Sequence, residues 1–420
     1  MKTPYILNIK NGLTLCIIEN EYSESVTLHL KGHAGSNYEG RDEIGAAHFI
    51  EHYLLNLPQN EKITRQKDAI LKGGGKIIGV TSRDDVLFMV KVLKEYFDTA
   101  LLYILTILNN DITYNEAAFE STRNAVLQEI EANNLKLSRI LSNSTYSIMF
   151  PKQRIGLPNT GKTEHAKKLT FSSLKSFHAG NYSYDNFTLV ISGNIKKKQV
   201  LEFLNGFDFP TGSQELQNKN TIDLKNSHNY KLNTLIKPGF LPCHIKIDFP
   251  SLKYSDDKSY ILNLLALILK LSLNRALKEN LPYINVECFN YSSGTFGIFS
   301  VYATLEGNNL ISYLNILRNV IDGINSISPE CLYDCKKVYK SNLLFSLEKT
   351  SSIAEYYSNC ITHGNKNQNH SYELRYIDKL IREELIRTTN NLFKYKPKVT
   401  LLLNSPISGK TENKIKQILG

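Results

Sequence analysis

The chain has 420 residues, of which 42% are apolar, so it is long enough for two or three domains with large hydrophobic cores. Its 50 lysines and arginines outnumber the 40 aspartates and glutamates, but they are scattered, with no arginine-rich block and no interleaving with aromatic residues. This pattern argues against a nucleic-acid-binding protein and is compatible with a mildly basic cavity that binds peptides.

We expect no targeting segment at the N-terminus. Residues 1–8 have neither the apolar core of a signal peptide nor the arginine- and serine-rich composition of a transit peptide. Six cysteines at irregular spacing indicate free thiols in a reducing compartment. We therefore expect a cytoplasmic protein.

Strand and helix patterns alternate through the first half of the chain. The pair Asn11-Gly12 between two apolar stretches is a strong hairpin signal. The predicted strands are 6–10, 13–18, 26–30, 76–82 and 85–92, and the predicted helices are 43–57, 63–73, 94–109 and 114–140.

The first of these helices carries His48, Glu51 and His52 in the spacing H-x-x-E-H, the inverted zinc-peptidase motif. On an α-helix, positions i, i+3 and i+4 fall within an arc of about 100°, so the three side chains share one face. A catalytic zinc binds histidine nitrogens and carboxylate oxygens and keeps one position open for water. We expect His48 and His52 to bind one zinc ion and Glu51 to act as the general base. The alternative is a solvated helix face without a metal.

Zinc needs a third protein ligand, and the best candidate is Glu129 on the predicted helix 114–140. The apolar stripe of this helix runs through Val126 and Ile130, and Glu129 lies at its edge, toward the core. A carboxylate is rarely buried without a charged partner, and a metal ion is such a partner. Glu131 points to the opposite side and is expected to be solvated. An ordinary surface glutamate is the alternative for Glu129.

Several segments of the first half carry a family resemblance. They are Asn11–Leu15, Gly35–Glu39, Gly45–His52, Gly74-Gly75, Thr81–Asp84 and Leu189–Asn194. Together they resemble the pitrilysin-type peptidases, in the branch of short subunits that includes processing peptidases. In that family the third zinc ligand is a glutamate of a following helix, and Glu129 follows His52 by 77 residues, which matches the family's spacing. The similarity covers residues 1 to about 205 well and the remainder weakly.

The second half repeats the order of elements of the first. Residues 206–230 are polar and lack periodicity, which predicts a linker. The predicted strands after it are 243–249, 283–291 and 295–305, and the predicted helices are 256–280, 307–325 and 329–361. We therefore predict an α+β fold with two similar domains, residues 1–205 and 231–420, each a mostly antiparallel sheet packed with helices. The resemblance implies that they form half of a peptidase chamber.

The longest apolar run, Ile261 to Leu273, is interrupted by Asn263 and Lys270 and is too short to cross a bilayer. We expect a buried helix there and no membrane span.

The family has an arginine and a tyrosine in its second domain that hold the substrate and the oxyanion. Tyr283 matches the tyrosine, although a structural tyrosine in a strand is the alternative. The arginine does not carry over: Ala276 stands at its position, Arg275 is one residue away, and a one-residue deletion would place Lys278 there. A lysine would supply charge without the two-pronged geometry of arginine.

Two further positions depart from the family. Ile78-Gly79 replaces the Asn-Ala that is common on the edge strand that receives the peptide, so we expect backbone pairing to survive and a side-chain contact to be lost. Thr122 stands where some members carry a further glutamate, which leaves support of the metal to other groups.

The resemblance implies a zinc endopeptidase for short or unfolded peptides, with the leader of a bacterial peptide precursor as one candidate substrate. Short members form homodimers, or heterodimers in which one subunit brings zinc and the other the substrate-gripping pair. The altered arginine favours a zinc-bearing subunit of a heterodimer. A non-catalytic structural or binding subunit is the alternative, although such relatives usually lose part of the H-x-x-E-H motif, which is complete here.

Overall fold

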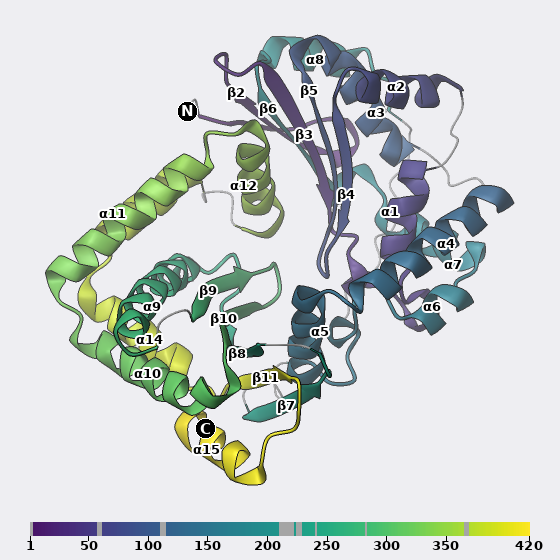
Figure 1. Ribbon diagram of the computed structural model, residues 1–420. Coiled ribbons are helices and arrows are strands. Elements are labelled where there is room, and N and C mark those ends of the chain that lie inside the picture. Colours follow the sequence, from purple (N-terminus) through teal and green to yellow (C-terminus); the bar gives the residue numbers. More distant parts are fainter. Residues whose placement is uncertain are drawn as a thin grey trace. The chain divides into compact units, whose positions relative to one another are not determined.

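The computed structural model describes residues 3–56, 61–109, 115–209, 222–223, 229–239, 242–281, 284–364 and 369–420. The chain forms two compact units, each built on one β-sheet (Figure 1). Unit 1 comprises Met1–Leu135, Leu157–Thr221 and Phe345–Thr362, and unit 2 comprises Lys136–Gly156, Ile222–Leu344 and His363–Gly420. Each unit therefore includes a helical segment from the other half of the sequence.

Unit 1 contains a six-stranded sheet in the order β1-β2-β6-β3-β5-β4. Its strands are β1 (Tyr5–Asn8), β2 (Thr14–Glu19), β3 (Ser25–Gly32), β4 (Lys76–Thr81), β5 (Val86–Leu93) and β6 (Phe187–Gly193). Neighbouring strands are antiparallel except for β2 and β6, which are parallel. The predicted hairpin is confirmed as the pair β1–β2, and β4 lies at the edge of the sheet.

Helices cover both faces of this sheet. They are α1 (Ala46–Asn56), α2 (Glu61–Lys72), α3 (Phe97–Asn109), α4 (Glu116–Asn133), α6 (Thr163–Lys168), α7 (Phe171–Asn181), α8 (Lys197–Asn205) and α12 (Thr350–His363). Side chains alternate along a strand, so Leu28 of β3 enters the main core while Thr27 points to the other face. There the hydroxyl of Thr27 lies 2.9 Å from that of Thr350, which ties α12 to the face opposite the core (Figure 1).

Unit 2 contains a five-stranded sheet in the order β7-β11-β8-β10-β9. Its strands are β7 (Lys231–Ile236), β8 (Cys243–Ser251), β9 (Asn285–Ser292), β10 (Gly297–Leu305) and β11 (Lys398–Leu403). Its helices are α5 (Leu137–Met149), α9 (Lys258–Asn280), α10 (Leu310–Gly323), α11 (Pro329–Ser346), α13 (His370–Lys379), α14 (Arg382–Phe393) and α15 (Gly409–Leu419). One parallel pair, β7–β11, again sits among antiparallel strands. The predicted α+β fold of two similar domains is confirmed.

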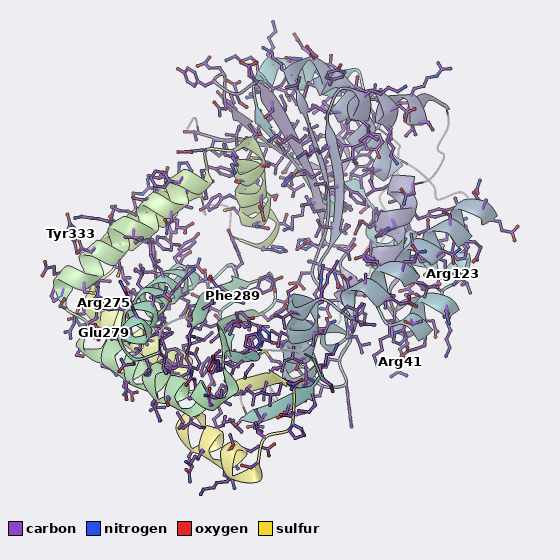
Figure 2. All side chains as sticks on the ribbon, in the orientation of Figure 1. Arg41, Arg123, Arg275, Glu279, Phe289 and Tyr333 are labelled. Atoms are coloured by element: carbon purple, nitrogen blue, oxygen red, sulfur yellow. The ribbon has the colours of Figure 1, made fainter. Side chains whose placement is uncertain are left out.

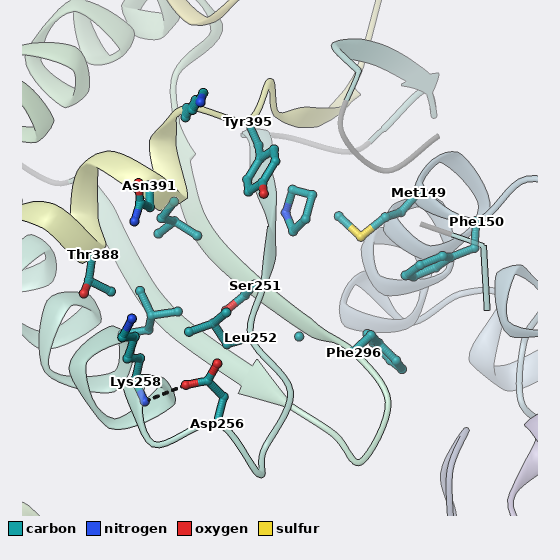
Figure 3. A pocket seen from close by; sticks show the side chains of 15 residues that line it. Met149, Phe150, Ser251, Leu252, Asp256, Lys258, Phe296, Thr388, Asn391 and Tyr395 are labelled. Atoms are coloured by element: carbon teal, nitrogen blue, oxygen red, sulfur yellow. Dashed lines mark hydrogen bonds between the residues drawn. The ribbon is translucent and has the colours of Figure 1, made fainter. Parts of the chain in front are cut away.

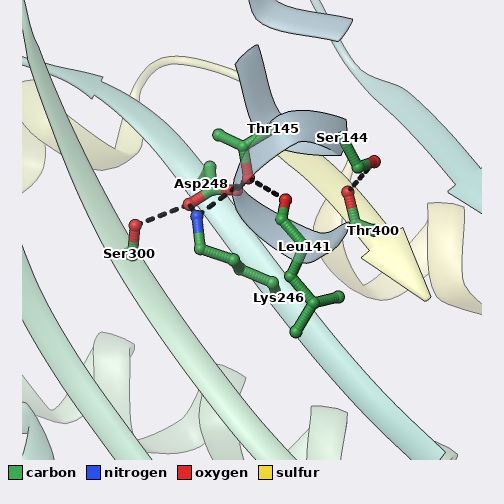
Figure 4. Close-up of polar contacts among 7 residues, drawn as sticks. All are labelled: Leu141, Ser144, Thr145, Lys246, Asp248, Ser300 and Thr400. Carbon is green, nitrogen blue, oxygen red and sulfur yellow. Dashed lines mark hydrogen bonds and ion pairs between the residues drawn. The ribbon is translucent and has the colours of Figure 1, made fainter. Parts of the chain in front are cut away.

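A buried polar network holds α5 on the sheet of unit 2 (Figure 4). The carboxylate of Asp248 on β8 is fully buried and pairs with the ammonium group of Lys246 at 2.5 Å. It also accepts hydrogen bonds from the hydroxyls of Thr145 on α5 and Ser300 on β10, each at 2.6 Å. Burying a charge is costly unless it is paired and hydrogen-bonded, and this carboxylate has both kinds of partner.

Helix α9 contains the longest apolar run of the sequence. It has 23 residues, and by length and composition alone it could cross a membrane, with a mean hydropathy of 1.4 over its most apolar window. Residues of that window are 56% buried within the fold, and the helix packs against β9. A helix buried in the core of a folded domain can be as long and as apolar as a membrane span, so length and composition alone do not separate the two.

Two predictions of single long helices are wrong. The stretch 114–140, whose first residue lies outside the described part of the chain, is divided between α4 and α5, and the stretch 329–361 is divided between α11 and α12. Lys136, between the first two helices, has an extended backbone with φ −79° and ψ 119°. Both breaks fall close to where the chain passes between the two units, so the two helices of each pair belong to different units.

The other predicted helices and strands are confirmed, with ends that shift by a few residues. Most of the predicted linker 206–230 lies outside the described residues.

Candidate metal centre

Helix α1, which carries the H-x-x-E-H motif, begins at a carboxylate. The side chain of Glu39 accepts hydrogen bonds from the backbone N–H groups of Gly45 at 2.8 Å and Ala47 at 3.1 Å. The first N–H groups of a helix have no partner within the helix, and negative charge is favoured at this end. Gly45 has φ +95°, a left-handed conformation that suits glycine. Glu39 therefore fixes where α1 starts.

Helix α4 packs against α1 and is anchored along its length. Its first turn is capped by Asn115, and the ring of Phe119 lies 5.1 Å from that of Phe49 on α1. The guanidinium group of Arg123 donates to the carbonyls of Ala166 at 2.7 Å and Leu169 at 3.0 Å. Figure 2 labels Arg123 on α4, toward α6. These contacts hold the helix in the position that brings its next turns to α1.

The three predicted zinc ligands meet between these two helices. His48, His52 and Glu129 each offer a ligand atom, and these atoms lie within 4.8 Å of one another. One carboxylate oxygen of Glu129 lies 3.4 Å from Nε2 of His48 and 3.1 Å from Nε2 of His52. The side chains of His52 and Glu129 are 24% and 32% exposed, so solvent reaches the cluster. Two imidazole nitrogens, one carboxylate and an open side fit the donor set of a catalytic zinc.

The electrostatics of the cluster couple the three groups. Hydrogen bonds from His48 and then His52 hold the pKa of the Glu129 carboxyl far below its ordinary value. The same contact with Glu129 raises the pKa of His52. Because the carboxylate stays ionised and both rings direct Nε2 toward it, the arrangement suits a divalent cation.

A fourth residue, Asn133, orients the carboxylate of Glu129. Its side-chain amide donates to Oε1 of Glu129 at 3.2 Å, which leaves Oε2 facing the two histidines. Asn133 is 8% exposed and lies one helical turn after Glu129. Thr122, at the position of the absent second glutamate, is buried. Glu131 is exposed, in agreement with the prediction.

Glu51 lies between α1 and the edge strand β4. Its side chain is buried, with a residue exposure of 5%, and the hydroxyl of Thr81 donates to its Oε2 at 2.9 Å. Gly79 faces the same carboxylate. A Cβ atom at Gly79 would lie 2.3 Å from Oε1 of Glu51.

The edge strand also has an exposed face. Ile78 is 42% and Val80 is 48% exposed, and they point away from α1, since strand residues alternate. The structure thus places Ile78 and Gly79 on an edge strand, as expected, with only Gly79 toward Glu51.

The predicted residues of the second half belong to unit 2. Lys278 is an exposed residue near the end of α9, and Arg275 lies one turn before it (Figure 2). Tyr283 lies outside the described residues. Their roles stay predictions.

Unit 2 also contains a cavity of about 440 Å³ that the sequence did not predict (Figure 3). Aromatic and aliphatic side chains dominate its wall, among them Met149, Phe150, Leu262, Phe296 and Tyr395. The carboxylate of Asp256 accepts a hydrogen bond from the backbone N–H of Lys258 at 3.0 Å. No histidine or cysteine is among the residues that line the cavity, so it lacks the ligand types of the zinc cluster in unit 1.

Comparison with known proteins agrees with this arrangement. Residues 15–162 match insulinase (peptidase family M16), and residues 168–330 match the peptidase M16 inactive domain. The chain belongs to peptidase family M16. The first match contains His48, Glu51, His52 and Glu129, and the sequence after it has no second H-x-x-E-H motif.

Similar proteins extend over nearly the whole chain. An uncharacterized zinc protease of Rickettsia felis is 22% identical over 396 residues, which are 92% of this chain and 94% of that protein. The mitochondrial-processing peptidase subunit beta of Neurospora crassa is 23% identical over 372 residues, with 83% and 76% covered. The crystal structure of a protease from Helicobacter pylori is 16% identical and superposes with a TM-score of 0.85, covering 96% of this chain and 99% of that one. The M16 fold is therefore shared along the chain.

Sequence reasoning missed Glu39, Asn133 and Thr81. Asn133 had a signal, because it is four residues after Glu129 on the same helix face. Glu39 and Thr81 stand in segments that carry the family resemblance, but the sequence shows no sign of their contacts with α1, since these depend on how loops and strands pack.

Proposed function

We propose that this M16 chain is a zinc-dependent endopeptidase that cleaves short or unfolded peptides. The observation that carries the proposal is the meeting of His48, His52 and Glu129 within 4.8 Å, with Glu51 buried one residue before the second histidine. His48, His52 and Glu129 would hold one zinc ion per chain. When bound, zinc polarises a carbonyl group and makes a bound water acidic near neutral pH.

The remaining chemistry falls to side chains of this protein. Glu51 would accept a proton from the attacking water and return it to the nitrogen of the leaving amine, which is the work of a general base followed by a general acid. Tyr283 would donate a hydrogen bond to the developing oxyanion, and Lys278 would supply positive charge toward the substrate, as the family resemblance implies.

The edge strand β4 supports the choice of substrate. A strand at the edge of a sheet has unpaired backbone groups and can take up an extended peptide as an additional strand. Ile78 would contact the side chains of that peptide, whereas Gly79 would contribute backbone only. A segment inside a folded protein already has its backbone groups paired and is not free to add to this edge, so we favour short or unfolded peptides. The leader of a bacterial peptide precursor is one candidate.

Metal analysis tests the site. We expect about one zinc ion per purified wild-type chain. The variants His48→Ala, His52→Ala and Glu129→Ala should each lose most of it. The matched control is Glu131→Ala, which removes an exposed glutamate from the same helix. Full zinc in Glu129→Ala together with loss in Glu131→Ala would show that the third ligand is wrong.

Substitution of the base tests the mechanism. Glu51→Gln should keep zinc and lose peptide cleavage by roughly 10²–10⁴-fold, because it removes only the proton acceptor. Wild-type activity in this variant would refute the mechanism. Zinc binding without turnover, with or without a partner subunit, would instead support a non-catalytic subunit.

A second candidate is the zinc-bearing subunit of a heterodimeric processing peptidase. Two observations favour it: relatives are named as the beta subunit of the mitochondrial processing peptidase, and the family's arginine does not carry over cleanly, since Ala276 stands at its position in an ungapped count, with Arg275 and Lys278 nearby. Tyr283→Phe should lower turnover roughly a hundredfold if the chain acts alone or as a homodimer. In a heterodimer the same variant would be nearly silent, and the isolated subunit would cleave poorly until its partner was added.

A further inference from the structure

The buried carboxylate of Glu51 has few partners. Among the described residues, the only group that donates a hydrogen bond to it is the hydroxyl of Thr81, at 2.9 Å. A buried carboxylate needs a donor, and loss of the only one leaves it unsatisfied. The Thr81 contact therefore selects the orientation of this side chain.

The strand that forms this contact is itself anchored. Thr81 pairs with Val86 and Gly79 with Phe88 on β5. The side-chain amide of Asn159 donates to the carbonyl of Thr81. The position of Thr81 and Gly79 is therefore fixed independently of Glu51.

We propose that Thr81 is a positioning residue for Glu51: its hydroxyl holds the carboxylate of Glu51 in place. This inference rests on the proposed function, in which Glu51 moves a proton. Proton transfer needs the base within hydrogen-bond reach of its partner, and a misplacement of about 1 Å can cost roughly a hundredfold in rate.

The test compares three variants with the wild type on one fluorogenic unfolded peptide. Thr81→Val removes the hydroxyl and keeps the shape, and Thr81→Ser keeps the hydroxyl. The matched control is Thr188→Val on β6, which makes the same change at a buried threonine three strands away in the same sheet. For each protein we would measure kcat, KM, zinc content and the thermal unfolding midpoint.

We expect kcat to fall about 10- to 100-fold in Thr81→Val, with KM within about twofold and zinc near one per chain. Thr81→Ser and Thr188→Val should stay within about twofold of the wild type. Wild-type kcat in Thr81→Val overturns the inference. Loss of zinc in that variant, or an equal loss of kcat in Thr188→Val, also overturns it, because the effect is then structural.

A crystal structure of Thr81→Val provides a readout that does not depend on activity. We expect the Glu51 carboxylate to have moved from its wild-type place, and a carboxylate that stays there would overturn the inference. Glu51→Gln, assayed in parallel, separates the two claims. Its full activity would refute the proposed function, whereas wild-type kcat in Thr81→Val with an inactive Glu51→Gln would refute the positioning role alone.

Discussion

Removal of the Glu39 carboxylate should loosen α1, the helix that carries two of the three proposed zinc ligands. Glu39 is 2% exposed, and its two oxygens accept hydrogen bonds from the N–H groups of Gly45 and Ala47 at the start of α1. In Glu39→Ala both N–H groups lose their acceptor in a buried environment. In Glu39→Gln one amide oxygen can still accept, but the negative charge at the helix N-terminus is gone.

The expected cost follows from these contacts. A hydrogen bond to a charged group contributes about 1.5–3 kcal/mol, and loss of a helix cap costs about 0.5–2 kcal/mol. The two bonds share one carboxylate and are not independent, so we expect Glu39→Ala to destabilise unit 1 by about 3 kcal/mol and Glu39→Gln by roughly half of that. In a unit of roughly 200 residues, about 3 kcal/mol lowers the unfolding midpoint by about 6–12 °C.

Calorimetry and amide hydrogen exchange would measure this effect. Protection of the α1 amides should fall in Glu39→Ala, and its affinity for zinc should fall as well, because His48 and His52 lie on that helix. Glu164→Ala, which removes an exposed glutamate on α6, is the matched control and should change stability by less than about 0.5 kcal/mol. A wild-type midpoint together with unchanged α1 protection in Glu39→Ala would refute the reasoning.

Three further predictions follow from buried polar groups. Asn133→Ala should weaken zinc binding about 10- to 100-fold in a chelator competition, since Glu129 loses its orienting donor; unchanged affinity would exclude that role. Asp248→Asn should destabilise unit 2 by about 3–5 kcal/mol in denaturant unfolding because Lys246 loses its charged partner, whereas Ser300→Ala should cost only about 1 kcal/mol. Burial lowers the pKa of His29 from 6.5 to about 4, so its contribution to stability is complete above pH 6.5 and is lost as the pH falls toward 4. His29→Leu should flatten that part of the pH profile of thermal unfolding, and an unaltered profile would contradict the assignment.

The sequence by itself determined the features that depend on local periodicity. The spacing of His48, Glu51 and His52 placed three side chains on one helix face before any packing was known. The apolar stripe of the later helix put Glu129 at its inner edge and Glu131 outside, and the structure has them so. The spacing of apolar residues along a helix or strand depends only on residues near one another in the sequence, so it can be read from a single chain.

Only the tertiary structure decided which elements meet. An amphipathic stripe continues through residues 114–140, so the sequence could not show that α4 packs in unit 1 and α5 in unit 2. The contacts of Glu39 and Thr81 with α1 join residues that are 6 to 30 positions apart through a loop and a strand. Such contacts depend on the packing of whole helices and strands against a common core. A periodic pattern in the sequence shows that one face of an element is apolar, but it does not show which other element covers that face.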